Sequence, residues 1–236
     1  MKKKYILLLL VTFSLVLLVI IEYQRHGKTN ELTTNFDTMV TFHERIDKNL
    51  SAQNSLFIGD SLIQGLAVSN VIDHAVNFGI GNDTTSGVIQ RLPTLKSIVN
   101  ARFVILAVGL NDFRYRGIEE ILVNYNKILK KLTITRHVVI SAVLPVDEFI
   151  VQGVDNAKIR QLNIALELLS REYTNTSFLN ITNKLTVLGS LSTDYHIGDG
   201  VHLNKTGNAI WIESLKLWLA QYDSTYLNKK CKNAKN

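Results

Sequence analysis

Apolar residues run in short uninterrupted stretches through the middle of the chain, and amphipathic stretches lie between them. Three of these amphipathic stretches, Ile118 to Leu132, Asn156 to Arg171 and Thr206 to Ala220, have helical spacing. The strand-like runs are residues 56–58, 75–78, 103–108, 138–144 and 177–179. Near-continuous apolar strands that alternate with helices indicate a parallel sheet covered on both faces. The pattern therefore predicts an α/β fold around a five-stranded parallel sheet.

The start of the chain has a different pattern. Residues 5–21 form an apolar run that only Thr12 and Ser14 interrupt, and three lysines precede it. The run is longer than the core of a typical signal peptide, and no small-x-small cleavage site follows it. Because a lysine cluster stays on the cytoplasmic side, we expect residues 1–23 to be a single-pass signal anchor with the rest of the chain outside. Secretion after cleavage and a buried soluble helix are the alternatives.

Three more segments complete the predicted domain organisation. Residues 24–53 combine a polar tether with a short amphipathic helix, whose apolar positions are Phe36, Met39, Val40, Ile46 and Leu50. Residues 54–224 form one α/β domain, because a chain of 236 residues with 46% hydrophobic content can bury a full core. Residues 225–236 form a basic tail that we expect to be disordered.

The formal net charge of +6 comes from the two ends of the chain. Three lysines lie at residues 2–4 and four more at residues 229–235, and without these seven the net charge is −1. A nearly neutral body lacks the basic surface of nucleic-acid-binding proteins. The only cysteine, Cys231, lies in the polar tail, which excludes an internal disulfide and a cysteine-based metal cluster.

A candidate nucleophile follows the first strand-like run. The run ends in Gly59-Asp60-Ser61, and a glycine at this point permits a sharp turn at the carboxyl end of the strand. Open α/β sheets bind their substrates at this edge. Ser61 is therefore the candidate nucleophile, although the triplet alone is also typical of a polar turn.

The next two strand ends supply candidate oxyanion donors. Residues 77–85 leave a strand and enter a helix, so their backbone N–H groups can bind a developing negative charge. Asn111 offers a neutral amide donor, or alternatively caps a helix. Gly79-Ile80-Gly81 also begins a dinucleotide-binding motif, but Thr84 stands where the third glycine belongs, which argues against a nucleotide site. An ordinary β–α turn is the remaining alternative for this segment.

A histidine and a carboxylate precede the last helix. Asp199 and His202 stand three residues apart, so the carboxylate can bind one imidazole nitrogen while the other faces a nucleophile. His196 with Asp199 and His202 also raises a metal-site alternative, but no further ligand cluster accompanies them. We expect His196 to be an exposed surface residue, and we predict neither a metal nor a cofactor.

Taken in order, these segments resemble the four blocks of the SGNH hydrolases, also called GDSL esterases and lipases. The resemblance covers about Ser55 to Trp211, and residues 77–85 are most similar to the branch with platelet-activating-factor acetylhydrolases and bacterial thioesterase/lysophospholipases. It implies a three-layer α/β/α flavodoxin-like sandwich. It also implies that Ser61 is the nucleophile, His202 the general base and acid, and Asp199 the residue that orients His202.

The resemblance also implies an oxyanion hole. Its donors are the backbone N–H groups of Ser61 and Asn82 and the side chain of Asn111. The family has a glycine where this chain has Asn82. A backbone donor survives that replacement, and asparagine tolerates a positive φ, but its side chain narrows the acyl pocket. The G-x-S-x-G elbow of α/β-hydrolases is absent, because Ile63 follows Ser61 by two residues.

We therefore expect a serine esterase that hydrolyses small acyl esters, acetyl or short to medium chain, of a carbohydrate or lipid through an acyl-enzyme. An acyltransferase to a cell-envelope acceptor and a catalytically inactive, membrane-tethered binding module are the alternatives. Residues 147–157, with Phe149, Ile150 and Val151, are the candidate wall of the substrate pocket. The expected partners are the ester substrate and, through the N-terminal helix, the membrane. No nucleic acid partner is expected.

Overall fold

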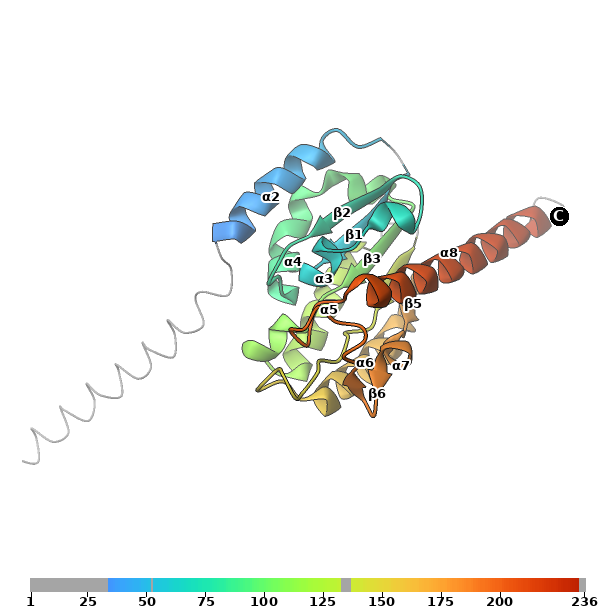
Figure 1. Ribbon diagram of the computed structural model, residues 1–236. Coiled ribbons are helices and arrows are strands. Elements are labelled where there is room, and N and C mark those ends of the chain that lie inside the picture. The colour runs from blue at the N-terminus through green and yellow to red at the C-terminus, as the bar shows by residue number, and fades with distance from the viewer. Residues whose placement is uncertain (1–33, 52, 133–136, 234–236) are drawn as a thin grey trace, which may run out of the picture.

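The computed structural model describes residues 34–51, 53–132 and 137–233 (Figure 1). Within them, one parallel sheet has the strand order β2–β1–β3–β4–β5. Its strands are β1 (Ser55–Gly59), β2 (Ala75–Gly79), β3 (Phe103–Ala107), β4 (Val138–Ser141) and β5 (Thr176–Leu179). Each strand forms from one of the predicted apolar runs, so the five-stranded parallel sheet is confirmed.

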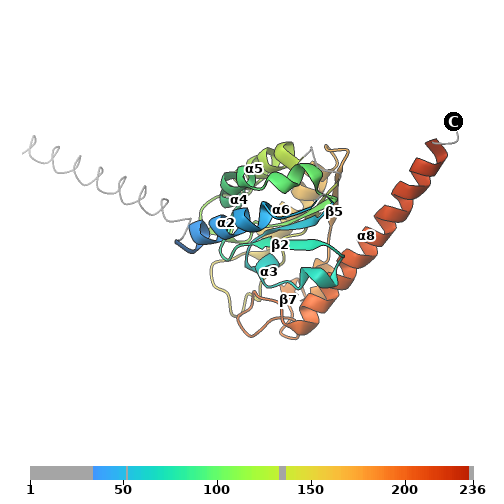
Figure 2. The ribbon, with the colours of Figure 1, turned by 90° about the horizontal axis from the view of Figure 1, so that it is seen from above.

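Helices cover both faces of this sheet. Leu56, Ile58 and Leu106 pack on one side against α4 (Thr85–Arg91), α5 (Ile118–Leu132) and α6 (Asn156–Ser170). Their strand neighbours Phe57 and Ile105 point the other way, because side chains alternate along a strand. They pack with α3 (Ser61–Gln64), α7 (Thr182–Leu185) and α8 (Lys205–Asn233). Figure 2 shows the sheet between these two layers.

The amphipathic stripe of α5 explains how that helix packs. Ile121, Tyr125, Ile128 and Leu132 recur at helical spacing and are buried against the sheet. The Tyr125 hydroxyl donates to the Val108 carbonyl oxygen at 2.6 Å. The helix therefore also holds the chain where it leaves β3, which is the edge that the sequence predicts for the chemistry.

The predicted amphipathic helix before the first strand is present as α2 (Thr34–Asp47). Its Phe36 and His43 are buried, and the ring of His43 lies 5.1 Å from that of Phe78 in β2. The predicted anchor at residues 1–23 lies outside the described residues. Among the residues that the structure does describe, no helix is both long enough and apolar enough to cross a membrane.

The last helix is longer than predicted. It spans Lys205–Asn233, and its C-terminal part extends away from the rest of the described chain (Figures 1 and 2). Residues 225–233, which we expected to be a disordered tail, belong to this helix. No glycine or proline follows Gly207, so the sequence contains no strong signal that would end the helix earlier.

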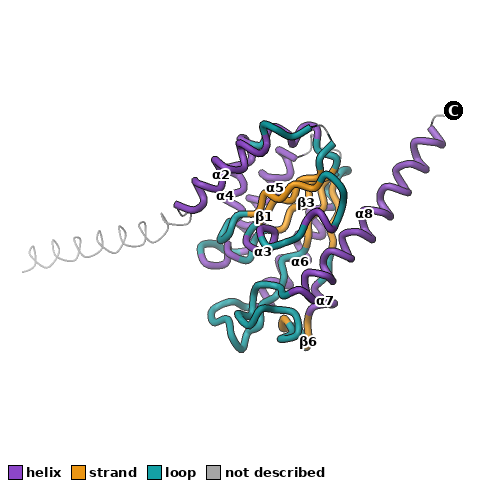
Figure 3. The backbone as a smooth tube through the Cα atoms, turned by 45° about the horizontal axis from the view of Figure 1, so that its top comes forward, coloured by secondary structure: helices purple, strands orange, loops and turns teal. Residues whose placement is uncertain are grey.

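The structure also contains a hairpin that the pattern did not predict. Strands β6 (Thr186–Val187) and β7 (Ser190–Leu191) pair antiparallel, apart from the main sheet (Figure 3). Short 3-10 helices occupy other connections, at Val68–Asn70 (η1), Leu92–Thr94 (η2), Lys96–Asn100 (η3) and Asn111–Arg114 (η4).

The strand order determines where a site can form. The chain goes from β1 to β2 on one side and then crosses to β3 on the other side of β1, which creates a topological switch point between β1 and β3. The two glycines that end β1 and β2 fit tightly there. A Cβ on Gly59 would lie 2.0 Å from the Ala107 carbonyl oxygen, and one on Gly79 would lie 2.2 Å from the Gln64 nitrogen. The predicted nucleophile and oxyanion segments all leave the sheet at this edge.

Candidate active site

Ser61, His202 and Asp199 form one continuous hydrogen-bonded series. Ser61 is the first residue of α3, and the carboxylate of Asp60 caps this helix by accepting the Leu62 N–H at 3.0 Å. The Ser61 Oγ lies 2.8 Å from His202 Nε2, across a sequence separation of 141 residues. His202 Nδ1 lies 2.6 Å from Asp199 Oδ2. These distances are within the range that nucleophilic catalysis requires.

The turn that contains Asp199 keeps its carboxylate ionised. Burial alone would raise the pKa of Asp199, but the backbone N–H of Val201 and the side chain and N–H of His202 lower that pKa to about 2. Both N–H groups donate to Oδ1, at 3.0 and 2.9 Å. An ionised Asp199 requires a proton on His202 Nδ1, so Nε2 is free to accept the Ser61 proton.

The three predicted oxyanion donors surround the same cavity. Ser61, Asn82 and Asn111 line it together with His202, and its volume is about 90 Å³. Within the described part of the chain, the N–H groups of Ser61 and Asn82 have no hydrogen-bond partner. Asn111 Nδ2 donates one hydrogen to the Asp83 carbonyl oxygen at 3.0 Å, which leaves its second N–H available. A developing oxyanion in this cavity would meet donors that are already in position.

Asn82 adopts the backbone conformation that favours a glycine. Its φ is +62°, in the left-handed region that asparagine tolerates better than most residues. The turn therefore keeps its geometry with asparagine in place of the family's glycine. The asparagine side chain occupies part of the cavity wall.

Buried charges join the three strand ends beneath the cavity. Arg91 Nε donates to Asp83 Oδ2 at 2.8 Å, and Arg91 Nη2 donates to the Gly59 carbonyl oxygen at 3.1 Å. Asp112 accepts the backbone N–H of Thr85 at 2.9 Å and also binds the Thr85 hydroxyl. Sequence reasoning missed this network, although Asp83 and Asp112 each follow a predicted asparagine donor directly.

Burial changes the protonation of these carboxyl groups. Burial is the main cause that raises the pKa of Asp60, and the charges of Asp83 and Asp112 act in the same direction. The Leu62 N–H and the His202 charge oppose them, and the net result is a pKa of about 7. Burial also raises the pKa of Asp83 to about 6, against the pull of Arg91. Burial therefore favours the neutral form of Asp60, the residue that caps the helix beginning with Ser61.

The predictions for His196 and for the pocket wall need correction. His196 is not exposed: only 6% of its surface is accessible, and Nε2 lies 3.3 Å from Asp147 Oδ2. Within the described ranges, no group of three or more side chains could hold a metal ion. In the candidate wall, Val151 lines the catalytic cavity, whereas Phe149 is 93% exposed and lines a separate, mostly apolar depression with Val187 and Leu188.

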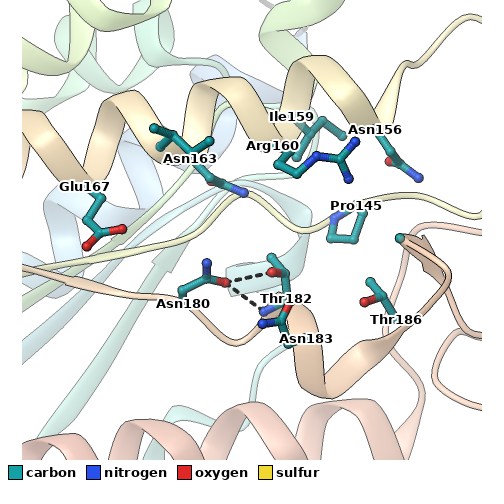
Figure 4. A pocket seen from close by; sticks show the side chains of 12 residues that line it. Pro145, Asn156, Ile159, Arg160, Asn163, Glu167, Asn180, Thr182, Asn183 and Thr186 are labelled. Atoms are coloured by element: carbon teal, nitrogen blue, oxygen red, sulfur yellow. Dashed lines mark hydrogen bonds between the residues drawn. The ribbon is translucent and has the colours of Figure 1, made fainter.

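A second cavity, of about 120 Å³, lies between α6 and the turn after β5 (Figure 4). Pro145 lines it, whereas the next residue, Val146, lines the catalytic cavity. Two buried asparagines of α6 stand beside it, and each pairs with the backbone of one residue: Asn156 with Val146 and Asn163 with Val143, at 2.8–2.9 Å. Asn156 therefore positions Val146 in one wall of the catalytic cavity, and sequence reasoning missed both asparagines.

A hydroxyl, an imidazole and a carboxylate in hydrogen-bonded series, beside unpaired N–H donors at the switch point of an α/β sheet, define the geometry of a serine hydrolase. Residues 57–210 match the GDSL-like Lipase/Acylhydrolase family. The match covers more than half of the chain, and the protein belongs to this family. It is therefore a carboxylic ester hydrolase, as the resemblance implied.

Several solved structures share this fold over most of the chain. A Streptococcus pneumonia protein described as a candidate platelet activating factor has 22% identity and a TM-score of 0.70, over 87% of this chain and 99% of its own. A GDSL-like lipase from Bacteroides thetaiotaomicron has 18% identity and a TM-score of 0.66, over 78% and 98%. A carbohydrate esterase family 3 member from Talaromyces cellulolyticus has 15% identity and a TM-score of 0.55, over 72% and 97%. No curated protein matches the chain.

Proposed function

We propose that this protein removes a short acyl group from a carbohydrate or lipid ester through an acyl-enzyme on Ser61. The series of contacts from Ser61 to His202 at 2.8 Å and from His202 to Asp199 at 2.6 Å carries the proposal. His202 Nε2 takes the Ser61 proton as the hydroxyl attacks the ester carbonyl carbon, and then gives that proton to the departing alcohol. Water repeats the attack on the acyl-enzyme and releases the acid.

The size of the catalytic cavity supports a short acyl group. Its volume of about 90 Å³ is well below the roughly 300–1,000 Å³ that is usual for sites of drug-sized ligands. Six apolar residues line it: Leu62, Leu110, Val146, Val151, Val154 and Val201. With p-nitrophenyl esters we expect acetyl and propionyl to be cleaved faster than octanoyl. An octanoyl preference would contradict the short-chain proposal while leaving the serine mechanism intact.

Replacement of Asn82 tests whether its side chain limits the length of the acyl chain. Asn82→Gly keeps the backbone N–H and the positive φ but removes a side chain from the cavity wall. We expect acetyl ester turnover to stay within about threefold of wild type, while hexanoyl ester turnover rises relative to it. Unchanged ratios between the two esters would show that the Asn82 side chain does not restrict the acyl group.

One charged side chain at the cavity supports an anionic alcohol portion. Arg114 lines the cavity, is exposed, and forms no ion pair with any described residue. A free guanidinium binds carboxylate and phosphate groups with two parallel hydrogen bonds. We therefore extend the proposal to esters whose alcohol part carries a negative charge near the scissile bond, as acidic sugars and lipid headgroups do.

Substitution of the nucleophile tests the proposed function. Ser61→Ala should lower the turnover of p-nitrophenyl acetate by a factor of about a thousand or more, while Ser69→Ala, which changes an exposed serine, should not. Full activity of Ser61→Ala would show the assignment to be wrong. A wild-type protein without any esterase activity would favour the binding-module alternative.

Two further parts of the proposal need their own experiments. Product analysis with and without sugar or lipid acceptors separates hydrolysis, which yields free acid, from acyl transfer, which yields an acylated acceptor. For location, we propose that residues 1–23 anchor the chain in a membrane with the catalytic domain on the extracytoplasmic side. The apolar run and its preceding lysines support this.

A further inference from the structure

The imidazole of His196 is buried inside the turn that carries Asp199 and His202. Its Nδ1 accepts the backbone N–H groups of Gly198 at 3.0 Å and Gly200 at 3.2 Å. Because both of these partners are donors, Nδ1 carries no proton, and the neutral ring has its proton on Nε2. His196 is therefore the opposite tautomer from His202, whose Nδ1 carries the proton.

The turn closes around this ring. The Ile197 N–H donates to the His202 carbonyl oxygen at 2.9 Å, and His196 pairs with Leu203 in an antiparallel bridge. Gly198 and Gly200 have φ angles of +102° and +76°, and this left-handed backbone lets both N–H groups point at the ring. The side chains of Asp199 and His202 are themselves about 40% exposed, so the ring is the buried group that holds their backbone in place.

Asp147 joins the same turn to the wall of the catalytic cavity. Its Oδ2 faces His196 Nε2 at 3.3 Å, and its Oδ1 accepts the Phe149 N–H at 3.0 Å. Its own N–H donates to the Gly200 carbonyl oxygen at 2.8 Å. Gly200 also packs against Val151, where a Cβ would lie 2.9 Å from the valine side chain. Val151 and Val146, on either side of Asp147 in the chain, both line the cavity.

From this arrangement we infer that His196 and Asp147 are positioning residues for the reaction. They hold the turn with Asp199 and His202 so that His202 stays at hydrogen-bond distance from Ser61, and they couple that turn to the wall of the catalytic cavity. The pair does not touch the reacting atoms. The inference rests on the proposed function, because it assigns a role within the same site. Replacing a buried charged pair by apolar residues of the same volume is often neutral or stabilising, whereas the hydrogen bonds of the pair fix the orientation of the groups that they join.

Two substitutions of His196 separate the effect of its hydrogen bonds from the effect of its packing. His196→Phe fills the same space without any hydrogen bond, whereas His196→Asn offers its side-chain oxygen near the position of Nδ1 and can still accept the two N–H groups. We expect His196→Phe to lower kcat for p-nitrophenyl acetate about ten- to a hundredfold, as a displacement of about 1 Å in a catalytic group does, with KM within about threefold. His196→Asn should recover most of this loss. His74→Asn, in an exposed turn, serves as the control.

Asp147→Asn tests the other member of the pair and does not depend on how His196 variants fold. Its amide would place an N–H against either the Phe149 N–H or the His196 Nε2–H. We expect a similar loss of kcat, and no further loss when it is combined with His196→Phe, because residues that act as a unit are not additive. Labelling of Ser61 by a fluorophosphonate should slow in parallel, since it depends on the same base.

The outcomes separate this inference from the proposed function. Folded His196→Phe or Asp147→Asn protein with wild-type kcat and labelling rate would overturn the inference. The inference would also be overturned if kcat fell equally in His196→Phe and His196→Asn and only in proportion to the fall in their melting temperatures. That result would indicate that His196 only stabilises the fold. A wild-type protein whose activity does not depend on Ser61 would instead refute the proposed function.

Discussion

Three carboxyl groups, those of Asp60, Asp83 and Asp112, lie buried where the chain leaves the strands that carry the site. Hydrogen bonds to Arg91, Thr85 and backbone N–H groups stabilise Asp83 and Asp112, whereas Asp60 accepts one backbone N–H, that of Leu62. An ionised Asp60 is therefore the least compensated charge near the site. This difference makes Asp60 the residue whose protonation should be visible in the stability of the protein.

Asp60→Asn should remove part of the pH dependence of folding. Burial raises the pKa of Asp60 in the folded state to about 7, above its usual value of 3.8 in an unfolded chain. The folded state therefore binds more protons than the unfolded state between these values, and its stability falls as pH rises through the window. We expect a contribution of up to about 1.4 kcal/mol per pH unit.

Urea unfolding at pH 5 and pH 7.5 measures this effect. The free energy of unfolding should fall more between these pH values in the wild type than in Asp60→Asn, and the exposed control Asp73→Asn should follow the wild type. Identical differences in wild type and Asp60→Asn would show that Asp60 keeps the same protonation state in both the folded and the unfolded chain.

Arg114→Gln should change substrate preference rather than turnover. Phenyl acetate and 3-acetoxybenzoate differ by one carboxylate on the alcohol portion. We expect Arg114→Gln to raise KM for the anionic ester about two- to fivefold and leave phenyl acetate unchanged, because an exposed ion pair contributes up to about 1 kcal/mol. The preference of the wild type should also weaken with added salt. Equal changes in KM for both esters would show that Arg114 does not take part in substrate recognition.

At the level of elements, the alternation of apolar runs and amphipathic stretches was sufficient to predict the main sheet and its long covering helices, but not the short helices α3 and α7. The central strands are continuous apolar runs because both of their faces are buried, whereas α5 has helical periodicity because one of its faces is buried. The β6–β7 hairpin was not predicted because each strand has two residues and their turn is Leu188-Gly189, without the usual Asn-Gly signal. The full length of α8 was not predicted because its last turns have no regular spacing of apolar residues.

The docking of α2 gives a prediction at this level. The Asp47 carboxylate accepts the backbone N–H of Lys96 at 2.6 Å and that of Ser97 at 3.2 Å, and it also binds the Ser97 hydroxyl. It thereby caps η3 and fastens α2 to the domain. We expect Asp47→Ala to lower the free energy of unfolding by about 1–2 kcal/mol, because it leaves partly buried donors without their partner.

Urea unfolding of Asp47→Ala beside Asp37→Ala, an exposed position on the same helix, provides the measurement. The kcat of folded Asp47→Ala should equal that of the wild type, because η3 precedes β3 and so lies at the amino end of the sheet, opposite the site. A stability equal to that of Asp37→Ala would contradict the assigned role of Asp47.

Across the whole molecule, the strand order brings together residues that are far apart in sequence. Ser61, Asn82 and Asn111 were predictable because each follows a strand, and parallel strands end at one edge. Asp199 and His202 were predictable from their three-residue spacing before the last helix. The roles of His196, Arg91 and Asn156 could not be predicted from the sequence, because they depend on which backbone groups lie next to these side chains in the folded chain. Each is a polar residue whose partner lies on a different element or in a left-handed turn, and sequence spacing contains no signal for that.

The predicted anchor also belongs to this scale. We expect the full chain to stay in carbonate-washed membranes and its catalytic domain to be digested by protease added outside intact spheroplasts. Leu10→Arg combined with Leu17→Arg should release the chain from the membrane fraction, because each charge at mid-membrane costs about 3 kcal/mol. Wild-type protein in the soluble cytoplasmic fraction would contradict the anchor, and a shortened chain in the medium would indicate cleavage.

The nucleophile itself can be observed directly. The full chain is incubated with a fluorophosphonate, digested, and examined by mass spectrometry while esterase activity is followed in parallel. The proposed mechanism predicts one adduct per molecule on the Ser61 hydroxyl, formed at the rate at which activity disappears, and no adduct in Ser61→Ala or in heat-unfolded protein. Complete inactivation with the adduct on another residue, or full activity with Ser61 fully labelled, would contradict it.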